Sequence, residues 1–149
     1  MGGAASNTLL HRLCNYIRRN YICNKASVAS TEHNNSANPF ILKVDTGASH
    51  NFIATRHQQH LQNLRKITNG PLATLPNNQT ISPSHQGNIH LHEDFTPAAT
   101  SALVYPNISN ESLLSVGQLC DDGCIAIFHP QIFAAIKNNK IILTGKRNK

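Results

Sequence analysis

The sequence has few of the residues that mark membrane spans or large aromatic cores. It contains no Trp, and no apolar run approaches the ~20 residues that cross a bilayer. The first residues also lack a basic start followed by an apolar segment, which is the pattern of a secretory signal peptide. We therefore expect no membrane partner and an intracellular, cytoplasmic protein whose four cysteines stay reduced.

Acidic residues are also scarce, since seven Asp and Glu stand against thirteen Lys and Arg, for a formal charge of +6. Such a balance attracts nucleic acid and other anionic partners. The basic residues are scattered, however, and the groups at 18–19 and 146–149 are too small to follow a phosphate backbone. We expect no nucleic-acid role for this segment. The alternative, a basic nucleic-acid-binding fragment, would show an affinity that falls steeply with salt.

The length of 149 residues suits one core of ordinary size. Apolar residues recur at helical spacing over residues 8–22, and residues 25–39 are polar and aperiodic. The sequence therefore predicts an N-terminal helix and flexible linker over 1–38 and a single domain over 39–149. The start also fits the loose myristoylation pattern with Gly2 as acceptor, but an unmodified start is the simpler interpretation.

Within residues 39–149 the pattern is that of an all-β fold, because short β-like runs alternate with turn signals. Residues 51–67 are open between an irregular loop and a short helix. The expected strands are 40–44, 72–75, 80–82, 88–92, 101–105, 124–128, 132–136 and 141–143.

The chemistry is concentrated where the first of these strands ends, at Asp45. The apolar run 40–44 predicts a buried strand, and Gly47 two residues after Asp45 permits a tight turn. A carboxylate presented in this way suits a site in which two carboxylates face each other across a twofold axis and share one proton. Thr46 can then hydrogen-bond across the axis, and Ser49 can bond the outer carboxylate oxygen. The alternative is an ordinary turn after a strand.

Four segments occur in a characteristic order: 40–49, 75–81, 112–124 and 141–147. Together they resemble the retropepsin-like aspartic protease region of Copia-type LTR retrotransposon polyproteins, over about residues 40–149. The resemblance implies a single retropepsin-like (acid protease) lobe and an aspartic endopeptidase with Asp45 as its catalytic carboxylate. Its catalytic loop would be supported by Thr46, Gly47, Ala48 and Ser49.

The resemblance also implies how the site is completed. Only one Asp-Thr-Gly is present, so the enzyme would be a homodimer that cleaves an extended polypeptide, namely the element's own polyprotein, without metal or organic cofactor. A strand ending at Val116 and Gly117 would pack beneath the Asp45 loop, so that Gly117→Val would overpack it.

A candidate flap over the cleft is expected at residues 82–88, with His85, Gln86 and Gly87 at its tip. This segment has one glycine where the family's flap tips are glycine-rich, which leaves its mobility open. The alternative function is that of an inactive or domesticated retroelement fragment that acts as a dimerising, peptide-binding module.

Two other sets of residues carry the side chains of metal sites or nucleophiles. They are His90, His92, Cys120 and Cys124, and Cys14 and Cys23 with His11 and His33. We interpret the first set as surface histidines and buried thiols rather than a zinc site. The second set falls in the predicted helix and linker, outside the core that could fix a nucleophile. Residues 121–122 are expected in a turn, not as a catalytic pair.

Overall fold

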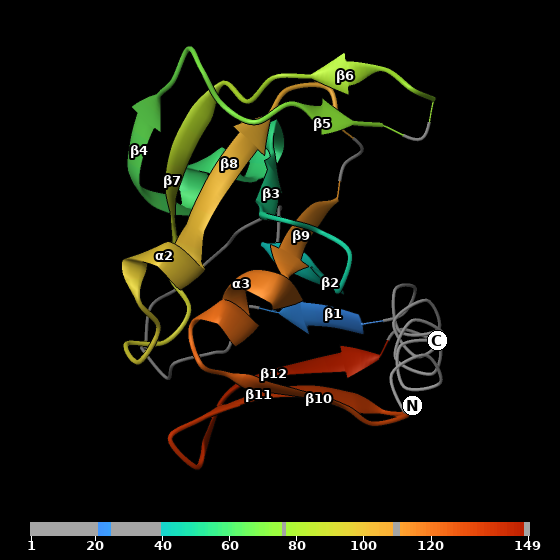
Figure 1. Cartoon of the computed structure of the whole chain (residues 1–149), viewed down its shortest axis with the longest axis vertical. Coiled ribbons are helices and arrows are strands. Elements are labelled where there is room, and N and C mark those ends of the chain that lie inside the picture. The colour runs from blue at the N-terminus through green and yellow to red at the C-terminus, as the bar shows by residue number, and fades with distance from the viewer. Residues whose placement is uncertain (1–20, 25–39, 76, 109–110, 148–149) are drawn as a thin grey trace, which may run out of the picture.

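The computed structural model describes residues 21–24, 40–75, 77–108 and 111–147. These residues are mostly β, as the sequence predicts, and form a ten-stranded sheet and a two-stranded hairpin (Figure 1). In the described part of the chain, no helix is long and apolar enough to cross a membrane.

The order of the large sheet is β10-β11-β12-β1-β2-β9-β3-β8-β7-β4. Its strands are β1 Tyr21–Asn24, β2 Ile41–Asp45, β3 Asn51–Ala54, β4 Leu61–Lys66, β7 His85–Ile89, β8 Ser101–Tyr105, β9 Ser112–Ser115, β10 Ile125–Phe128, β11 Ile132–Lys137 and β12 Lys140–Arg147. The hairpin consists of β5 Ala73–Thr74 and β6 Thr80–Ile81, and the helical segments are η1 Thr55–His60, α2 Pro97–Thr100 and α3 Val116–Asp121.

Two parallel strand pairs form the centre of the sheet, β2 with β9 and β3 with β8. Along β2 the side chains alternate, so that Leu42 and Val44 are buried while Ile41 is exposed. Leu114 of β9 and Ile53 of β3 are fully buried in the same core. The apolar run before Asp45 therefore forms the buried strand that its composition predicts.

The N-terminal part differs from the sequence-based expectation. Residues Tyr21–Asn24 form β1 between β12 and β2, although residues 21 and 22 were expected to end a helix. The sheet thus includes a strand from before residue 39, in the segment where a helix and linker were expected. The rest of the predicted helix and linker, with Gly2, lies outside the described residues.

The expected flap is also wrong. His85, Gln86 and Gly87 lie in β7, which is paired on both sides with β8 and β4. Gly87 is buried, and a Cβ at this position would lie 2.9 Å from the carbonyl oxygen of Gln62. The glycine is thus required for close packing of β7 on β4, not for mobility.

The projecting hairpin is instead β5–β6, which extends away from the large sheet at the top of Figure 1. Its turn is closed by a hydrogen bond from Leu75 N to Gln79 O (2.8 Å). Asn78 adopts a φ of 64°, a left-handed conformation that Asn tolerates better than most residues. The two asparagines at 77–78 therefore explain why the chain reverses here.

The undecided segment 51–67 contains β3, η1 and β4, and η1 carries a buried histidine. His57 is 1% exposed, and its Nδ1 lies 2.8 Å from Ser112 Oγ, which also accepts a hydrogen bond from Ala54 N. The His57 Nε2 atom has no hydrogen-bond partner, and the Phe40 ring meets the imidazole edge-on. Burial lowers the pKa of His57, and the nearby charge of Arg56 lowers it further.

This burial predicts a stability that falls in mild acid. The pKa of His57 in the folded protein is below 6.5. As the pH falls, His57 therefore becomes protonated in the unfolded chain before it does so in the folded protein. The contribution of neutral His57 to the free energy of unfolding is complete above about pH 6.5. It is lost as the pH falls toward the folded pKa, by at most about 1.4 kcal/mol per pH unit. Urea unfolding between about pH 7.5 and about pH 5 should show this slope. His57→Gln should flatten it and His90→Gln, at an exposed site, should not; equal slopes in both variants would contradict the assignment.

Candidate active site

Asp45 lies at the end of β2, where the parallel register places it opposite Ser115 of β9. The chain then turns through residues 46–50 before β3 begins at Asn51. The backbone N–H of Gly47 donates a hydrogen bond to Asp45 Oδ1 (2.7 Å). Asp45 as a residue is partly buried, and this hydrogen bond lets the loop's own backbone hold one carboxylate oxygen.

The loop after Asp45 is anchored from below by Ser115, which is fully buried. Its hydroxyl donates to the carbonyl of Ala48 (2.6 Å) and accepts a hydrogen bond from Gln118 N (3.2 Å). The second contact makes Ser115 the N-cap of α3. One side chain therefore fixes both the Asp45 loop and the start of the following helix.

The end of the loop is anchored by Asn51, whose side chain is also fully buried. Its Oδ1 accepts from Ser115 N (2.8 Å), and its Nδ2 donates to the carbonyls of Ala99 and Ser101 (3.0 and 2.9 Å). The backbone N–H of Asn51 donates to Gln118 Oε1 (2.6 Å). Asn51, Ser115 and Gln118 thus form a closed set of hydrogen bonds between the loop, β9, α3 and the α2–β8 junction.

Val116 and Gly117 are placed differently from the expectation. Strand β9 ends at Ser115, and these two residues begin α3. Val116 is buried, but Gly117 is exposed, and a Cβ there would meet only Ser115 Oγ at 3.5 Å and Ala48 O at 4.0 Å. The strand does support the Asp45 loop, but Ser115 makes the contact, and the expected overpacking by Gly117→Val has no steric basis at Cβ.

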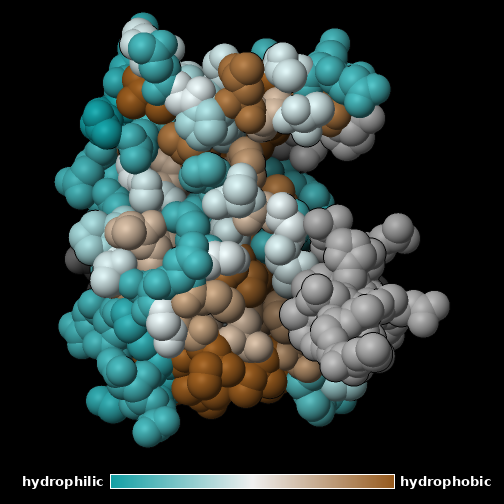
Figure 2. All heavy atoms as spheres, in the orientation of Figure 1, coloured by the Kyte–Doolittle hydropathy of each residue, from teal (hydrophilic) through white to brown (hydrophobic). Residues whose placement is uncertain are grey.

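Asp45 opens onto a cleft of about 950 Å³, which lies beneath the β5–β6 hairpin and appears as the hollow in Figure 2. Its floor is the Asp45 loop, its roof is residues 72–75 and 77, and its walls include Phe52, Leu113 and Glu111. The β5–β6 hairpin, and not residues 82–88, therefore lies over the cleft where a flap was expected.

Within the described lining of this cleft, Glu111 is the other carboxylate. Its Oε2 is 3.3 Å from Lys43 Nζ, and both side chains are substantially exposed. Among the described residues that line this cleft, Asp45 is thus the carboxylate that is not in an ion pair with a lysine.

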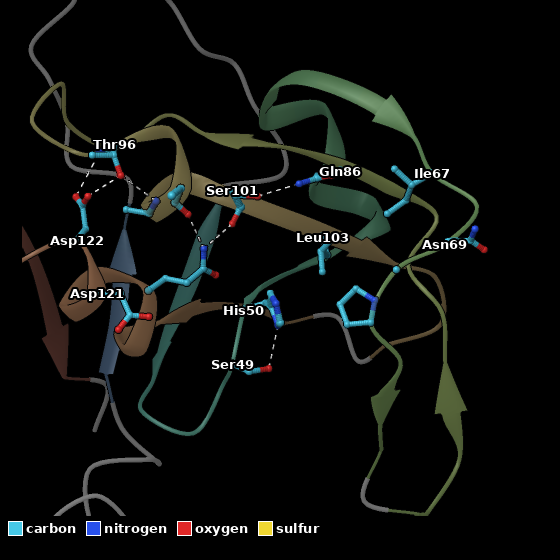
Figure 3. A pocket seen from close by; sticks show the side chains of 15 residues that line it. Ser49, His50, Ile67, Asn69, Gln86, Thr96, Ser101, Leu103, Asp121 and Asp122 are labelled. Atoms are coloured by element: carbon cyan, nitrogen blue, oxygen red, sulfur yellow. Dashed lines mark hydrogen bonds between the residues drawn. The ribbon is translucent and has the colours of Figure 1, made fainter.

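Ser49 and His50 line a second groove, of about 620 Å³ (Figure 3), and Ser49 also lines the Asp45 cleft. Ser49 Oγ lies 3.0 Å from His50 Nδ1. Ser49 was expected to bond the Asp45 carboxylate, whereas its hydroxyl contacts His50. Thr46 follows Asp45 in the loop and is partly buried.

Asp122, which also lines the second groove, is held by neighbours. Its carboxylate accepts hydrogen bonds from Lys137 Nζ (2.7 Å) and Thr96 Oγ1 (2.5 Å). Burial alone would raise the pKa of Asp122, but these hydrogen bonds lower it below its usual value. Asp122 thus joins α3 to α2 and β11, which is a structural role.

The alternative sites do not form among the residues described. No group of three or more His, Cys, Asp or Glu side chains there could hold a metal ion. Cys124 is buried as expected, but Cys120 is exposed, contrary to the expectation of two buried thiols. Cys14, His11 and His33 lie outside the described residues, as does the side chain of Cys23.

Comparison with known proteins finds no family model, no curated protein and no solved structure that matches this chain. The chemistry of the site therefore follows from its own geometry. Its three anchoring residues, Asn51, Ser115 and Gln118, are absent from the sequence-based set of site residues. A local signal exists for two of them, since Ser115 followed three residues later by Gln118 fits the capping-box pattern that begins a helix.

Removing the Ser115 hydroxyl tests this anchoring. Ser115→Ala should destabilise the protein by about 1–3 kcal/mol, because it deletes a helix cap and leaves the Ala48 carbonyl without its buried donor. Urea unfolding measures the change. Ser82→Ala, at an exposed serine, is the control and should stay within about 0.5 kcal/mol of the parent. Equal stability of both variants would show that the loop is held by other contacts.

Proposed function

We propose that this chain is an aspartic endopeptidase that works as a homodimer, with its reaction centre formed by Asp45 from each of two copies. The observation that carries the proposal is the placement of Asp45 at the end of a buried parallel strand, in an anchored loop that floors a hairpin-covered cleft. The four segments that resemble Copia-type protease regions support the same reading.

In this mechanism a water molecule is held between the two carboxylates. The ionised carboxylate takes a proton from the water, whose oxygen attacks the scissile carbonyl carbon. The protonated carboxylate donates a hydrogen bond to the carbonyl oxygen and stabilises the tetrahedral intermediate. The carboxyl group that took the proton from the water then passes it to the leaving nitrogen, and the C–N bond breaks. The Gly47 N–H holds one Asp45 oxygen in place, so the carboxylate does not need to reorient during the reaction.

The cleft suits an extended polypeptide. It lies between the Asp45 loop and the β5–β6 hairpin, and the apolar side chains of Phe52, Leu72 and Leu113 are part of its lining. An extended segment can pair with strand edges while alternate side chains enter such apolar pockets. The natural substrate, by the resemblance of the four segments, is the polyprotein of a Copia-type retrotransposon.

The first test replaces the carboxylate by an amide of the same size. Asp45→Asn should keep the fold and abolish cleavage of a peptide library, because the amide cannot share a proton with its symmetry mate. Asp121→Asn, at an exposed acid, should cleave like the parent. Binding of peptides without cleavage by the parent would favour the peptide-binding module instead. Cleavage by Asp45→Asn at the parental rate, or inhibition by chelators in place of pepstatin-like compounds, would refute the assignment.

The second test is the dependence on protein concentration. If each chain supplies half of the site, specific activity should rise with concentration until dimers saturate, and the midpoint should match the dissociation constant from sedimentation. The parent should also show a bell-shaped pH–rate profile, as expected for two coupled carboxylates. Constant specific activity down to concentrations at which the protein sediments as a monomer would exclude a shared site.

A further inference from the structure

The Asp45 cleft is acidic as well as apolar. Among the described residues that line it, the charged ones are Asp45 and Glu111, and none is a Lys, Arg or His. The protein as a whole carries a formal charge of +6, so the cleft places two acids together on a basic molecule. Charges of one sign in a hollow focus the electric field and attract the opposite charge. The lining therefore favours an occupant that carries positive charge.

Glu111 is free to meet such an occupant, because its ion pair with Lys43 is weak. The Glu111 side chain is 60% exposed and that of Lys43 is 31% exposed. An ion pair with this exposure to solvent is screened and contributes little. Glu111 is among the described lining residues and Lys43 is not. A carboxylate accepts several hydrogen bonds at once, so Glu111 can bind a second cation beside Lys43 or in its place.

Strand β9 sets the distance between Glu111 and the reaction centre. Asp45 is opposite Ser115, and Glu111 lies directly before β9, which begins at Ser112. Since a strand rises about 3.3 Å per residue, the backbone of Glu111 lies about 13 Å along β9 from the level of Asp45. An extended polypeptide covers this distance in about four residues, and the long side chains that meet there can shorten it to about two.

The apolar part of the lining can hold the residues nearest the reaction centre. Phe52 and Leu113 line the cleft, and the Phe52 ring packs on that of Tyr105, with 5.0 Å between ring centroids. Leu72 in the roof is 65% exposed, which leaves an apolar side chain for an occupant to cover. A polypeptide with apolar side chains near Asp45 and a basic side chain farther out would match both parts of the lining.

We infer that Glu111 is a specificity-determining residue, which favours substrates with a lysine or arginine about two to four residues from the scissile bond. This inference rests on the proposed function and names the substrate class of the same site. In a homodimer the twofold axis passes between the two Asp45 loops, so one Glu111 lies on each side of the reaction centre. The preferred substrate is thus a polypeptide with an apolar centre and a basic residue on each side of it.

Matched peptides test the inference. They share one apolar centre that the parent cleaves, and Lys, Gln or Glu is placed in turn at each of the four residues on either side. We expect the parent to cleave the best Lys peptide about three- to fivefold faster, as kcat/KM, than its Gln counterpart, with a smaller ratio at high salt. Glu111→Gln should remove this preference. Glu111→Lys should reverse it in favour of the Glu peptide.

Two further variants separate the role of Glu111 from a general effect of charge. Lys43→Gln removes the competing cation, so the preference for Lys should grow. Glu93→Gln is the matched control, because Glu93 is an exposed acid that lines a different groove. It should keep the parental preference. Thermal unfolding of each variant checks that the fold is retained.

Binding of the same peptides to Asp45→Asn, followed by fluorescence anisotropy, separates recognition from cleavage. If the parent cleaves Lys and Gln peptides equally, or if Glu111→Gln keeps the parental preference, the inference about Glu111 is wrong while the proposed function stands. If Lys peptides bind through Glu111 but the parent cleaves none, the proposed endopeptidase fails and the recognition by Glu111 stands. A protein that neither binds nor cleaves the peptides contradicts both.

Discussion

The parallel pairing of β2 with β9 is the constraint on which the rest of the site depends. It brings Asp45 beside Ser115, two residues far apart in the sequence, and everything that holds the Asp45 loop is built on that register. A shift of one residue would turn the buried side chains of β2 toward solvent, which makes the register strongly determined. The packing of the core thus fixes the position of the Asp45 carboxylate.

The buried polar side chains around the β2–β9 pair make hydrogen bonds with several of their atoms. Asn51 uses both ends of its amide, and Ser115 uses its hydroxyl as donor and acceptor. Buried polar groups of this kind specify one arrangement of the backbone, because any alternative would leave them without partners. The loop that carries Asp45 is therefore rigid at its base, while the cleft above it is bounded by a two-stranded hairpin with few neighbours. A rigid floor beneath a hairpin with few neighbours would suit the polypeptide cleavage proposed above.

Much of this architecture follows from local patterns in the sequence, and the misses have physical reasons. The strand at 101–105 and the buried strand before Asp45 were predictable, because apolar runs bounded by turn signals reflect short-range rules. β1 was missed because helical spacing in residues 8–22 says nothing of a strand pairing completed from the far end of the chain. Gly87 was misread because a glycine can serve close packing as well as mobility. Ser115 was missed because its main acceptor, the Ala48 carbonyl, is reached only through the fold.

The position of β1 has a consequence for how the protein folds. β1 lies between β2, which follows it closely in the sequence, and β12, whose pairing joins Tyr21 to Arg147. Such a contact spans most of the chain, and contacts of large sequence separation form slowly because a long loop must close first. During synthesis one side of β1 stays unpaired until residues 140–147 have left the ribosome. Premature release of a shorter chain would leave the β12-facing side of β1 unpaired. The large sheet is therefore complete only when residues 140–147 have been made.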